Sequence, residues 1–459
     1  MLKKFSLWTL ILLTLFISGC NNEKGHNLYV GAEGSYNEEL NLTLLKNLYI
    51  GLFEYDSNNK IIPILAESYS YSEDGRRMFI KIKDGFNWSD GSPIISQDVV
   101  DGLKNIINQY TGEYAYQYSY LDNKAEDNIK INDDGFVEIT LKKEFTDFEK
   151  VLAMPFYYPV KNSEDFLKGP YSGNFIVEKN SGDKIILSDK DKEKAIAENR
   201  TETIVVEKNL DKEKLVKGYQ EKNFDIIFPS NKVLEIEGEK ISSPGITLLW
   251  INTRNSEFRN LETRKAIYQS IEKIDGIYPS VYREKNSQEK VNISTTYTPT
   301  TMAPKILVID SESEIEKANK ISSQLAKKMD ITVEVIVKPV EEYFEDLRKG
   351  NFDFALETWE GDYFGKNAFF ELFRNPINNP LNVSGLIVPE INELQNKINK
   401  MADSQEREAL FAELEKQILQ SVPAIIVSEG IEKEAYVQRI KNININTIYN
   451  YHDYSSIKY

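Results

Sequence analysis

Acidic and aromatic side chains that could do chemistry gather in one short segment, Trp359-Glu360-Gly361-Asp362-Tyr363, and Glu357 stands just before it. Two carboxylates on either side of a substrate can act as general acid and general base. A hydrolase that uses Glu357, Glu360 or Asp362 is therefore one hypothesis. Paired acids are also common in loops, and the chain lacks the GxSxG motif of a serine nucleophile. The sequence therefore gives the hydrolase hypothesis little support.

The composition narrows the function classes further. Among 459 residues there are 72 Asp and Glu against 56 Lys and Arg, a formal charge of −16. Nucleic acids and anionic membrane surfaces require basic patches, so we expect neither as the main partner. The chain lacks GxxxxGK[ST], GxGxxG and HExxH, and its two histidines, His26 and His452, lie near opposite ends. We expect no cofactor and no metal site.

The amino terminus has the features of an export signal. Lys3 and Lys4 precede an apolar stretch of 13 residues, 5–17, which is too short for a membrane span of roughly 20 residues. Ile17-Ser18-Gly19-Cys20 follows and contains the single cysteine of the chain. It resembles a bacterial lipoprotein signal, which implies removal of residues 1–19 and lipidation of Cys20. The alternative is an ordinary signal peptide that carries a cysteine by chance.

The acidic segment must be positioned by an α/β unit that precedes it. Apolar periodicity predicts, in order, a strand at 306–309, a helix after Ser311, a strand at 331–337, a helix at 340–347 and a strand at 352–358. This alternation predicts a parallel sheet with right-handed crossovers. Ligands on such sheets bind beyond the carboxyl ends of the strands, and Trp359–Tyr363 lies at that place.

Other segments predict further elements. Met78, Ile80 and Ile82 alternate with more polar residues between Asp-Gly turns, which indicates a strand in a β-rich region. Ser96 is a candidate helix cap, and a second β-rich stretch follows Gly169-Pro170-Tyr171. We predict one helical run over 389–419 and a strand over 422–427. Arg264 in a predicted helix is interpreted as a structural ion pair.

Several motifs together resemble the solute-binding proteins of peptide ABC importers, the oligopeptide-binding lipoproteins of solute-binding protein family 5. The matching segments occur in the family's order and cover most of the chain beyond the signal. They are Leu48–Asp56, Ile62–Ser68, Ser72–Gly75, Lys83–Pro93 with Gln97–Val100, Gly169–Tyr171, Asn252–Thr253 with Arg264–Ala266, Trp359–Tyr363 and Gln405–Arg407. Lys83-Asp84-Gly85-Phe86-Asn87-Trp88-Ser89-Asp90-Gly91-Ser92-Pro93 is the strongest, and we interpret it as architectural.

The resemblance implies an α/β, two-lobed fold of the periplasmic-binding-protein type II, with an extra inserted β-rich domain. It implies the following division: 1–19 signal peptide; 20–48 with 166–245 and 430–459 lobe one; 49–165 inserted domain; 246–429 lobe two. The implied function is not enzymatic. The resemblance implies lobes that close around an oligopeptide and deliver it to a membrane permease that a separate ATPase drives. We expect a monomer, exported and anchored through Cys20 to the outer face of the cell membrane, on the periplasmic side where an outer membrane exists.

The resemblance also implies ligand-binding residues. Asp362 would hold the α-amino group of the peptide, with Trp359 and Tyr363 as walls. Tyr116, Tyr118 and Tyr120 lie where the family's inserted domain approaches the ligand, and Glu39 lies near its early ligand-contacting loop. Core packing and turn capping are the structural alternatives for these residues. The alternatives in function are nickel, haem, an oligosaccharide or a signalling peptide on the same fold, or an adhesive lipoprotein.

Overall fold

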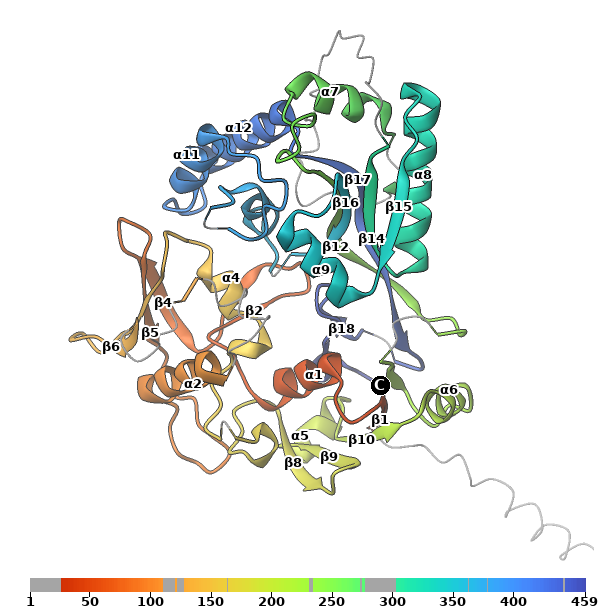
Figure 1. Ribbon diagram of the computed structural model, residues 1–459. Helices are drawn as coiled ribbons and strands as arrows, with labels where there is room; N and C mark the ends of the chain where they lie inside the picture. The colour runs from red at the N-terminus through yellow and green to blue at the C-terminus, as the bar shows by residue number, and fades with distance from the viewer. Residues whose placement is uncertain are drawn as a thin grey trace, which may run out of the picture.

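The computed structural model is described for ten ranges of the chain: 26–109, 120–121, 128–162, 164–230, 234–272, 275–276, 303–361, 363–377, 379–440 and 442–459. These residues form three parts (Figure 1). We call the part built on β1 and β8–β11 lobe one, the part built on β14–β16 lobe two, and the part built on β4–β7 the inserted domain. Within the described residues, no helix combines the length and apolar character needed to cross a bilayer.

One sheet runs through both lobes. Its path among the described strands is β15-β14-β16-β12-β17-β11-β1-β10-β9-β8, with β13 (Asp275–Gly276) attached to β17. The long strands β12 (Glu239–Ile251) and β17 (Ala424–Val437) pair antiparallel and join the lobes. Their register shifts between Ser243 and Ile246. The lobes are thus connected by two adjacent strands with a pairing irregularity between them.

Lobe one begins with β1, which pairs parallel to both β10 and β11, while β9 and β8 extend the sheet antiparallel. Asn37 caps α1 by accepting a 3.0 Å hydrogen bond from the Leu40 amide. Leu40, Leu44 and Leu48 form the buried face of that helix. The elements are β1 (Asn27–Glu33), α1 (Glu38–Leu48), η3 (Phe166–Lys168), β8 (Phe175–Asn180), β9 (Lys184–Asp189), α5 (Lys192–Ala197), β10 (Thr203–Leu210), α6 (Lys212–Gln220), β11 (Ile226–Phe228), β18 (Asn444–Ile445), β19 (His452–Asp453) and η5 (Tyr454–Ser456).

Lobe two contains the predicted α/β unit. β14 pairs parallel to β15 on one side and to β16 on the other, so the prediction of a parallel sheet is confirmed. Ala318, Ile321 and Leu325 of α8 are buried, as the periodicity predicts. The elements are α7 (Leu261–Ser270), β14 (Lys305–Ile309), α8 (Glu312–Met329), β15 (Glu334–Lys338), α9 (Val340–Lys349), β16 (Phe354–Trp359), α10 (Asn367–Phe370) and η4 (Glu371–Phe373).

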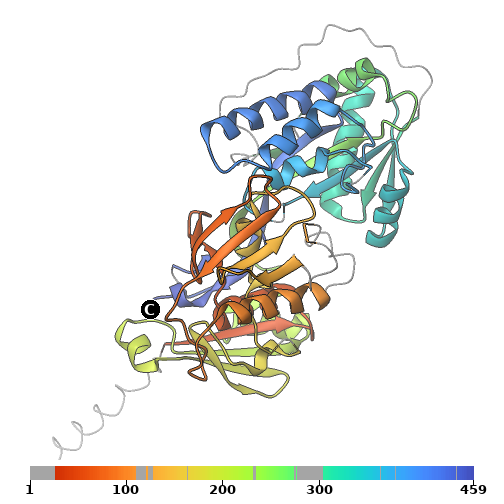
Figure 2. The ribbon, with the colours of Figure 1, turned by 90° about the vertical axis from the view of Figure 1, so that its left-hand side faces the viewer.

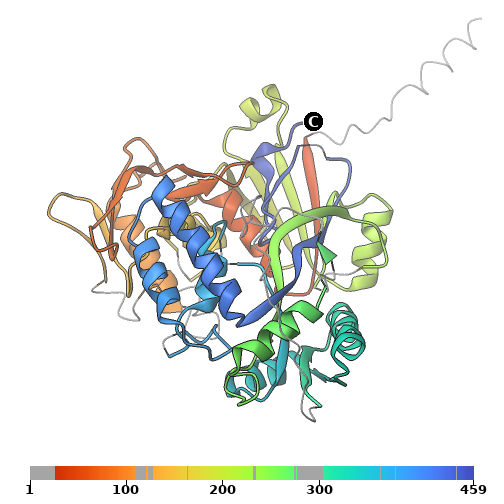
Figure 3. The same cartoon turned by 90° about the horizontal axis from the view of Figure 1, so that it is seen from above.

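The predicted single helical run at 389–419 is wrong. It consists of two helices, α11 (Pro389–Ile398) and α12 (Gln405–Ser421), which lie side by side in Figure 3. Ser404 begins the second helix by accepting a 3.1 Å hydrogen bond from the Arg407 amide. A serine in this role satisfies an amide that lacks a partner within the helix, and so favours a new start over a continued helix.

The inserted domain has a four-stranded antiparallel sheet in the order β4-β5-β7-β6. Met78 and Ile80 of β5 are buried, whereas Phe79 between them is less so, which confirms the predicted alternation. In Figure 2 its orange strands lie below the blue helices α11 and α12. The elements of this part are β2 (Phe53–Tyr55), β3 (Ile61–Pro63), β4 (Ala66–Tyr71), β5 (Arg77–Ile82), α2 (Ser96–Gln109), β6 (Ile129–Ile131), β7 (Val137–Thr140), α4 (Phe148–Leu152) and η2 (Pro155–Tyr157).

Two motif residues of the sequence have structural contacts. The buried Trp88 indole donates a 3.0 Å hydrogen bond to Asp98 Oδ2, so the turn at 88–93 is tied to the start of α2. Arg264 is buried and donates to the backbone carbonyls of Ser421 and Val422 at 2.7–3.1 Å. The predicted ion pair at Arg264 is wrong, because its acceptors among the described residues are backbone carbonyl oxygens, those of Phe258 and Arg259 as well as those at the end of α12.

Candidate functional site

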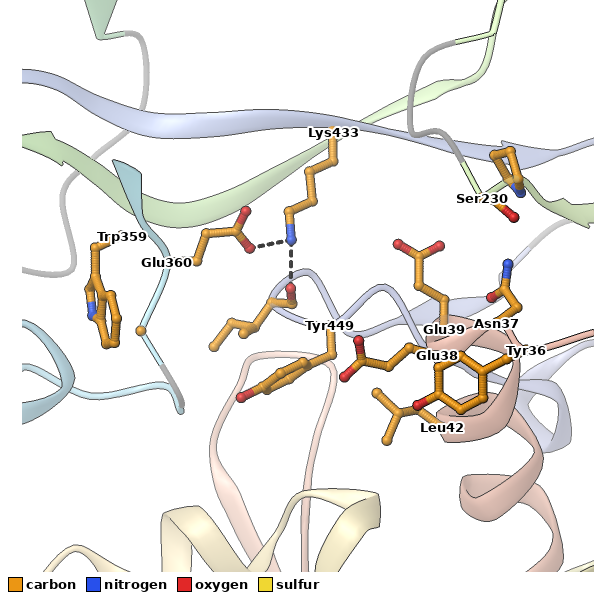
Figure 4. Close-up of a pocket in the computed structure, with 13 residues that line it drawn as sticks. Tyr36, Asn37, Glu38, Glu39, Leu42, Ser230, Trp359, Glu360, Lys433 and Tyr449 are labelled. Carbon is orange, nitrogen blue, oxygen red and sulfur yellow. Dashed lines mark hydrogen bonds and ion pairs between the residues drawn. The ribbon is translucent and has the colours of Figure 1, made fainter. Parts of the chain in front are cut away.

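A cavity of about 480 Å³ lies between the two lobes. Lobe one contributes the segment before α1, the first turns of α1, the end of β11 and the carboxyl-terminal segment. Lobe two contributes the end of β16, and β17 contributes one lysine. The lining residues are Tyr36, Asn37, Glu38, Glu39, Leu42, Pro229, Ser230, Trp359, Glu360, Gly361, Lys433, Ile448 and Tyr449 (Figure 4).

The strand topology explains why these residues meet. β1 and β11 are parallel neighbours in lobe one, and β16 lies in the parallel unit of lobe two. The chain enters the cavity just after each of these strands ends, which is where open α/β sheets bind ligands. In lobe one, the Ser230 amide donates to Glu33 Oε2 at 2.8 Å and Asn37 Nδ2 donates to the Phe228 carbonyl at 3.1 Å. These bonds fix the ends of β1 and β11 to each other.

The charged groups of the cavity come from three different segments. Lys433 forms an ion pair with Glu360 and donates a 2.5 Å hydrogen bond to the Ile448 carbonyl (Figure 4). Glu39 Oε2 accepts from Asn450 Nδ2 at 2.9 Å, and Glu38 is exposed. Three glutamates against one lysine give the described lining a formal charge of −2. The site is therefore suited to a ligand with positive charge.

Aromatic rings form part of the walls. The Trp359 indole donates to the Ala368 carbonyl at 2.9 Å, which fixes its ring at the end of β16. Tyr449 packs edge-on against Phe156, with ring centroids 5.9 Å apart. Tyr36 is 72 % exposed. Rings of this kind provide apolar area together with a polar edge or hydroxyl.

The structure brings Trp359 and Glu39 of the predicted site into the cavity lining. Tyr363 and Tyr120 do not line it. Both are buried, and both contact Phe145, with centroid distances of 5.8 and 4.0 Å. Burial raises the pKa of the Tyr363 hydroxyl well above its usual value. Asp362, Tyr116, Tyr118 and the lipidation residue Cys20 lie outside the described residues, so their roles stay predictions.

The acids of the hydrolase hypothesis are not brought together in the described cavity. Glu360 lines it and is paired with Lys433, whereas Glu357 does not line it. Glu357 accepts a 2.6 Å hydrogen bond from the Trp250 indole, and burial raises the pKa of Glu357 to about 7. A pair of carboxylates that flanks a substrate is thus not formed by these two residues.

Several lining residues were not predicted as ligand contacts. Tyr36 and Asn37 follow the end of β1, just as Glu360 follows Trp359, the last residue of β16, so the rule for carboxyl ends of strands could have indicated them. Lys433 and Tyr449 give no such signal. They come from a strand and a loop about 200 residues beyond β11 along the chain, and only the folded sheet places them here.

Comparisons with known proteins agree with this architecture. The family described as bacterial extracellular solute-binding proteins, family 5 Middle, matches residues 60–321. The probable deoxycholate-binding periplasmic protein YgiS of Escherichia coli is 22 % identical over 448 residues, covering 83 % of this chain and 82 % of that protein. The dipeptide-binding protein DppE of Bacillus subtilis is 21 % identical over 449 residues, covering 83 % and 81 %.

Among solved structures, the unliganded open form of MppA, the periplasmic murein tripeptide binding protein of Escherichia coli, has a TM-score of 0.75 and 16 % identity. The alignment covers 95 % of this chain and 97 % of that one. This likeness confirms the predicted fold class, a two-lobed α/β fold of the periplasmic-binding-protein type with an additional β-rich part.

Proposed function

We infer the function from the family, because the chain belongs to the bacterial extracellular solute-binding proteins of family 5. Such proteins bind the substrate of a peptide ABC importer and are not enzymes. For this chain we propose that the substrate is an oligopeptide, bound between the two lobes and handed to a membrane permease that a separate ATPase drives. We also propose lipidation at Cys20, which would hold the mature chain at the outer face of the cell membrane.

The observation that carries the proposal is the acidic cavity between the lobes. Every free peptide has an α-ammonium group, and carboxylates form strong charge-assisted hydrogen bonds with it. Glu38, Glu39 and Glu360 provide carboxylates in the described lining. Asp362 follows Gly361, which itself lines the cavity, so Asp362 remains our candidate for the direct ammonium contact. Trp359 would pack on the peptide.

We propose that the lobes move about β12 and β17. The resemblance implies lobe boundaries at 245/246 and 429/430, and an inserted domain at 49–165. The two lobe boundaries would fall at the register shift between β12 and β17. Gly430 there has a positive φ of 77°, a conformation that a side chain disfavours. A pairing irregularity and a glycine are features that allow two connecting strands to bend.

The relatives bind chemically different ligands, so charge helps to choose among them. YgiS is described as a probable deoxycholate-binding protein, and deoxycholate is an anion, whereas DppE is described as dipeptide-binding. A lining with a formal charge of −2 disfavours an anion and accepts an ammonium group. Peptide is therefore the ligand class that this cavity supports best.

Native mass spectrometry of the purified full chain tests the proposal directly. We expect peptides to copurify and to be displaced by added peptide, with binding confirmed by titration calorimetry. Copurified deoxycholate, haem, nickel or oligosaccharide would contradict the peptide assignment while keeping the binding function. Turnover of a peptide or glycoside by the pure protein would instead support the hydrolase.

A further inference from the structure

The charge of the cavity should determine which peptides bind best, an inference that rests on the proposed function. The described lining has three glutamates and one lysine. A peptide with uncharged side chains carries one positive and one negative terminus, so it leaves the formal charge of −2 unchanged. A cleft lined by one sign of charge concentrates ligands of the opposite sign.

The single lysine of the described lining already has partners within the protein. Lys433 forms an ion pair with Glu360 and donates to the Ile448 carbonyl, and its side chain is 11 % exposed. A ligand carboxylate that recruits Lys433 would have to weaken these contacts. Since Lys433 offsets the charge of Glu360, the formal charge of −2 of the described lining comes from Glu38 and Glu39, and it favours added cations over added anions.

Aromatic rings stand beside the acids. Tyr36 lies near Glu38, while Trp359 precedes Glu360 at the end of β16, and all four line the cavity (Figure 4). Aromatic faces attract ammonium and guanidinium groups, and the aliphatic stems of Lys and Arg pack well on apolar surface. Both the charged head and the stem of a basic side chain therefore find suitable partners here.

We propose that the interlobe cavity selects basic peptides, whose Lys or Arg side chains are held by Glu38 and Glu39 beside Tyr36 and Trp359. A peptide with two basic side chains and both termini charged has a net charge of +2, which balances the described lining. The site itself stands on the cavity between the lobes and on the family, whereas its acids determine the ligand class.

Titration calorimetry with three tripeptides tests the proposal: Lys-Ala-Lys, tri-alanine and Glu-Ala-Glu, each in low and in high salt. We expect Lys-Ala-Lys to bind about tenfold more tightly than tri-alanine, because two partly exposed ion pairs each contribute modestly. Glu-Ala-Glu should bind more weakly than tri-alanine. High salt should reduce these differences, since it screens exposed charges.

Matched variants separate the cavity from the general acidity of the chain. The double variant Glu38→Gln and Glu39→Gln should lower the affinity for Lys-Ala-Lys much more than the affinity for tri-alanine, and should so abolish most of the preference. The control Glu213→Gln and Glu341→Gln makes the same change in charge at exposed positions of α6 and α9, outside the cavity, and should keep the preference.

Each outcome has a distinct meaning. If tri-alanine and Lys-Ala-Lys bind equally, or Glu-Ala-Glu binds best, the selection proposed here is wrong and peptide binding stands. If the control variant loses the preference as the cavity variant does, the cavity acids are not its origin. If none of the three peptides binds, the proposed function itself fails.

Discussion

Two charged regions connect parts of this molecule, and they differ in how much water reaches them. Asp147, at the start of α4 in the inserted domain, and Arg407 of α12 form an ion pair in which both side chains are at most 3 % exposed. In the cavity between the lobes, Glu360 is 28 % exposed and Glu38 lies at the surface. Both regions contain carboxylates, yet only the second has room for a ligand.

The buried region is satisfied from within the protein. Arg407 Nη1 and Nη2 donate to the two Asp147 oxygens at 3.0 and 2.5 Å, and Lys150 and Asn367 donate at 2.6 and 2.7 Å. Burial favours the neutral acid, but Lys150 and Arg407 outweigh it and hold the pKa of Asp147 well below its usual range. A carboxylate with four donors has no capacity left for a peptide, so its role is to join the inserted domain to lobe two.

The comparison is tested most strongly by Arg407→Met. We expect it to lower the free energy of unfolding by about 3–5 kcal/mol, because Asp147 remains buried without its main partner. Urea unfolding followed by circular dichroism measures this. Arg348→Met, at an exposed position of α9, is the matched control and should change stability by about 0.5 kcal/mol or less. A similar small loss for Arg407→Met would contradict a structural role for the buried pair.

Asp362→Ala should lower peptide affinity and leave the stability of the fold largely unchanged, the opposite of Arg407→Met. We expect peptide affinity to fall by about 2–5 kcal/mol, the usual cost of removing one partner of a desolvated charge pair, while urea unfolding changes little. Asp362→Asn is the matched variant, because it keeps size and removes charge. Unchanged affinity in calorimetry would remove Asp362 from the proposed site.

The sequence predicts which strands lead to the cavity, but it does not predict every side chain that lines it. Strand and helix periodicity located β14–β16, and the rule for carboxyl ends then placed Trp359 and Glu360 at the site. The rule cannot tell which way a following side chain turns. Tyr363 stands only four positions after Trp359, yet its ring packs against Phe145 of the inserted domain.

The sequence also does not predict which residues far apart along the chain contact each other. Asp147 and Arg407 are 260 residues apart, and no local pattern marks them as partners. Lys433 reaches the cavity because β17 lies beside β12 over nearly its whole length, a consequence of the sheet order and not of the residues near it. Periodicity determines which face of an element is apolar, whereas contacts between distant polar groups depend on the assembled fold.

Glu357 allows a test at a third carboxylate, one that is half-buried and for which the described residues provide no ion-pair partner. Its pKa is raised by burial to about 7 from the usual 4.5, so the folded state binds more protons than the unfolded state between these pH values. The wild-type free energy of unfolding should therefore fall as pH rises through this window. Glu357→Gln does not titrate and should be more stable than wild type at pH 8 by on the order of 2 kcal/mol.

Urea unfolding at several pH values measures this difference. Below the unfolded pKa both forms carry a neutral group, so the advantage of Glu357→Gln should disappear near pH 4. An advantage that is constant across pH would indicate a packing effect, and none at all would mean that the Glu357 carboxylate is well solvated. Glu341→Gln on the exposed surface of α9 serves as the control.

Tyr36→Ala should have the smallest effect of the four variants, and it tests the cavity without changing the buried ion pair. Tyr36 is 72 % exposed, so its removal should change the free energy of unfolding by about 0.5 kcal/mol or less. If basic side chains stack on its ring, affinity for Lys-Ala-Lys should fall by about 0.5–1 kcal/mol, the range of exposed cation–π contacts. Tyr36→Phe keeps the ring and should retain that affinity. Equal losses for both variants would assign the contact to the hydroxyl, and a loss of stability would mean that Tyr36 supports the fold.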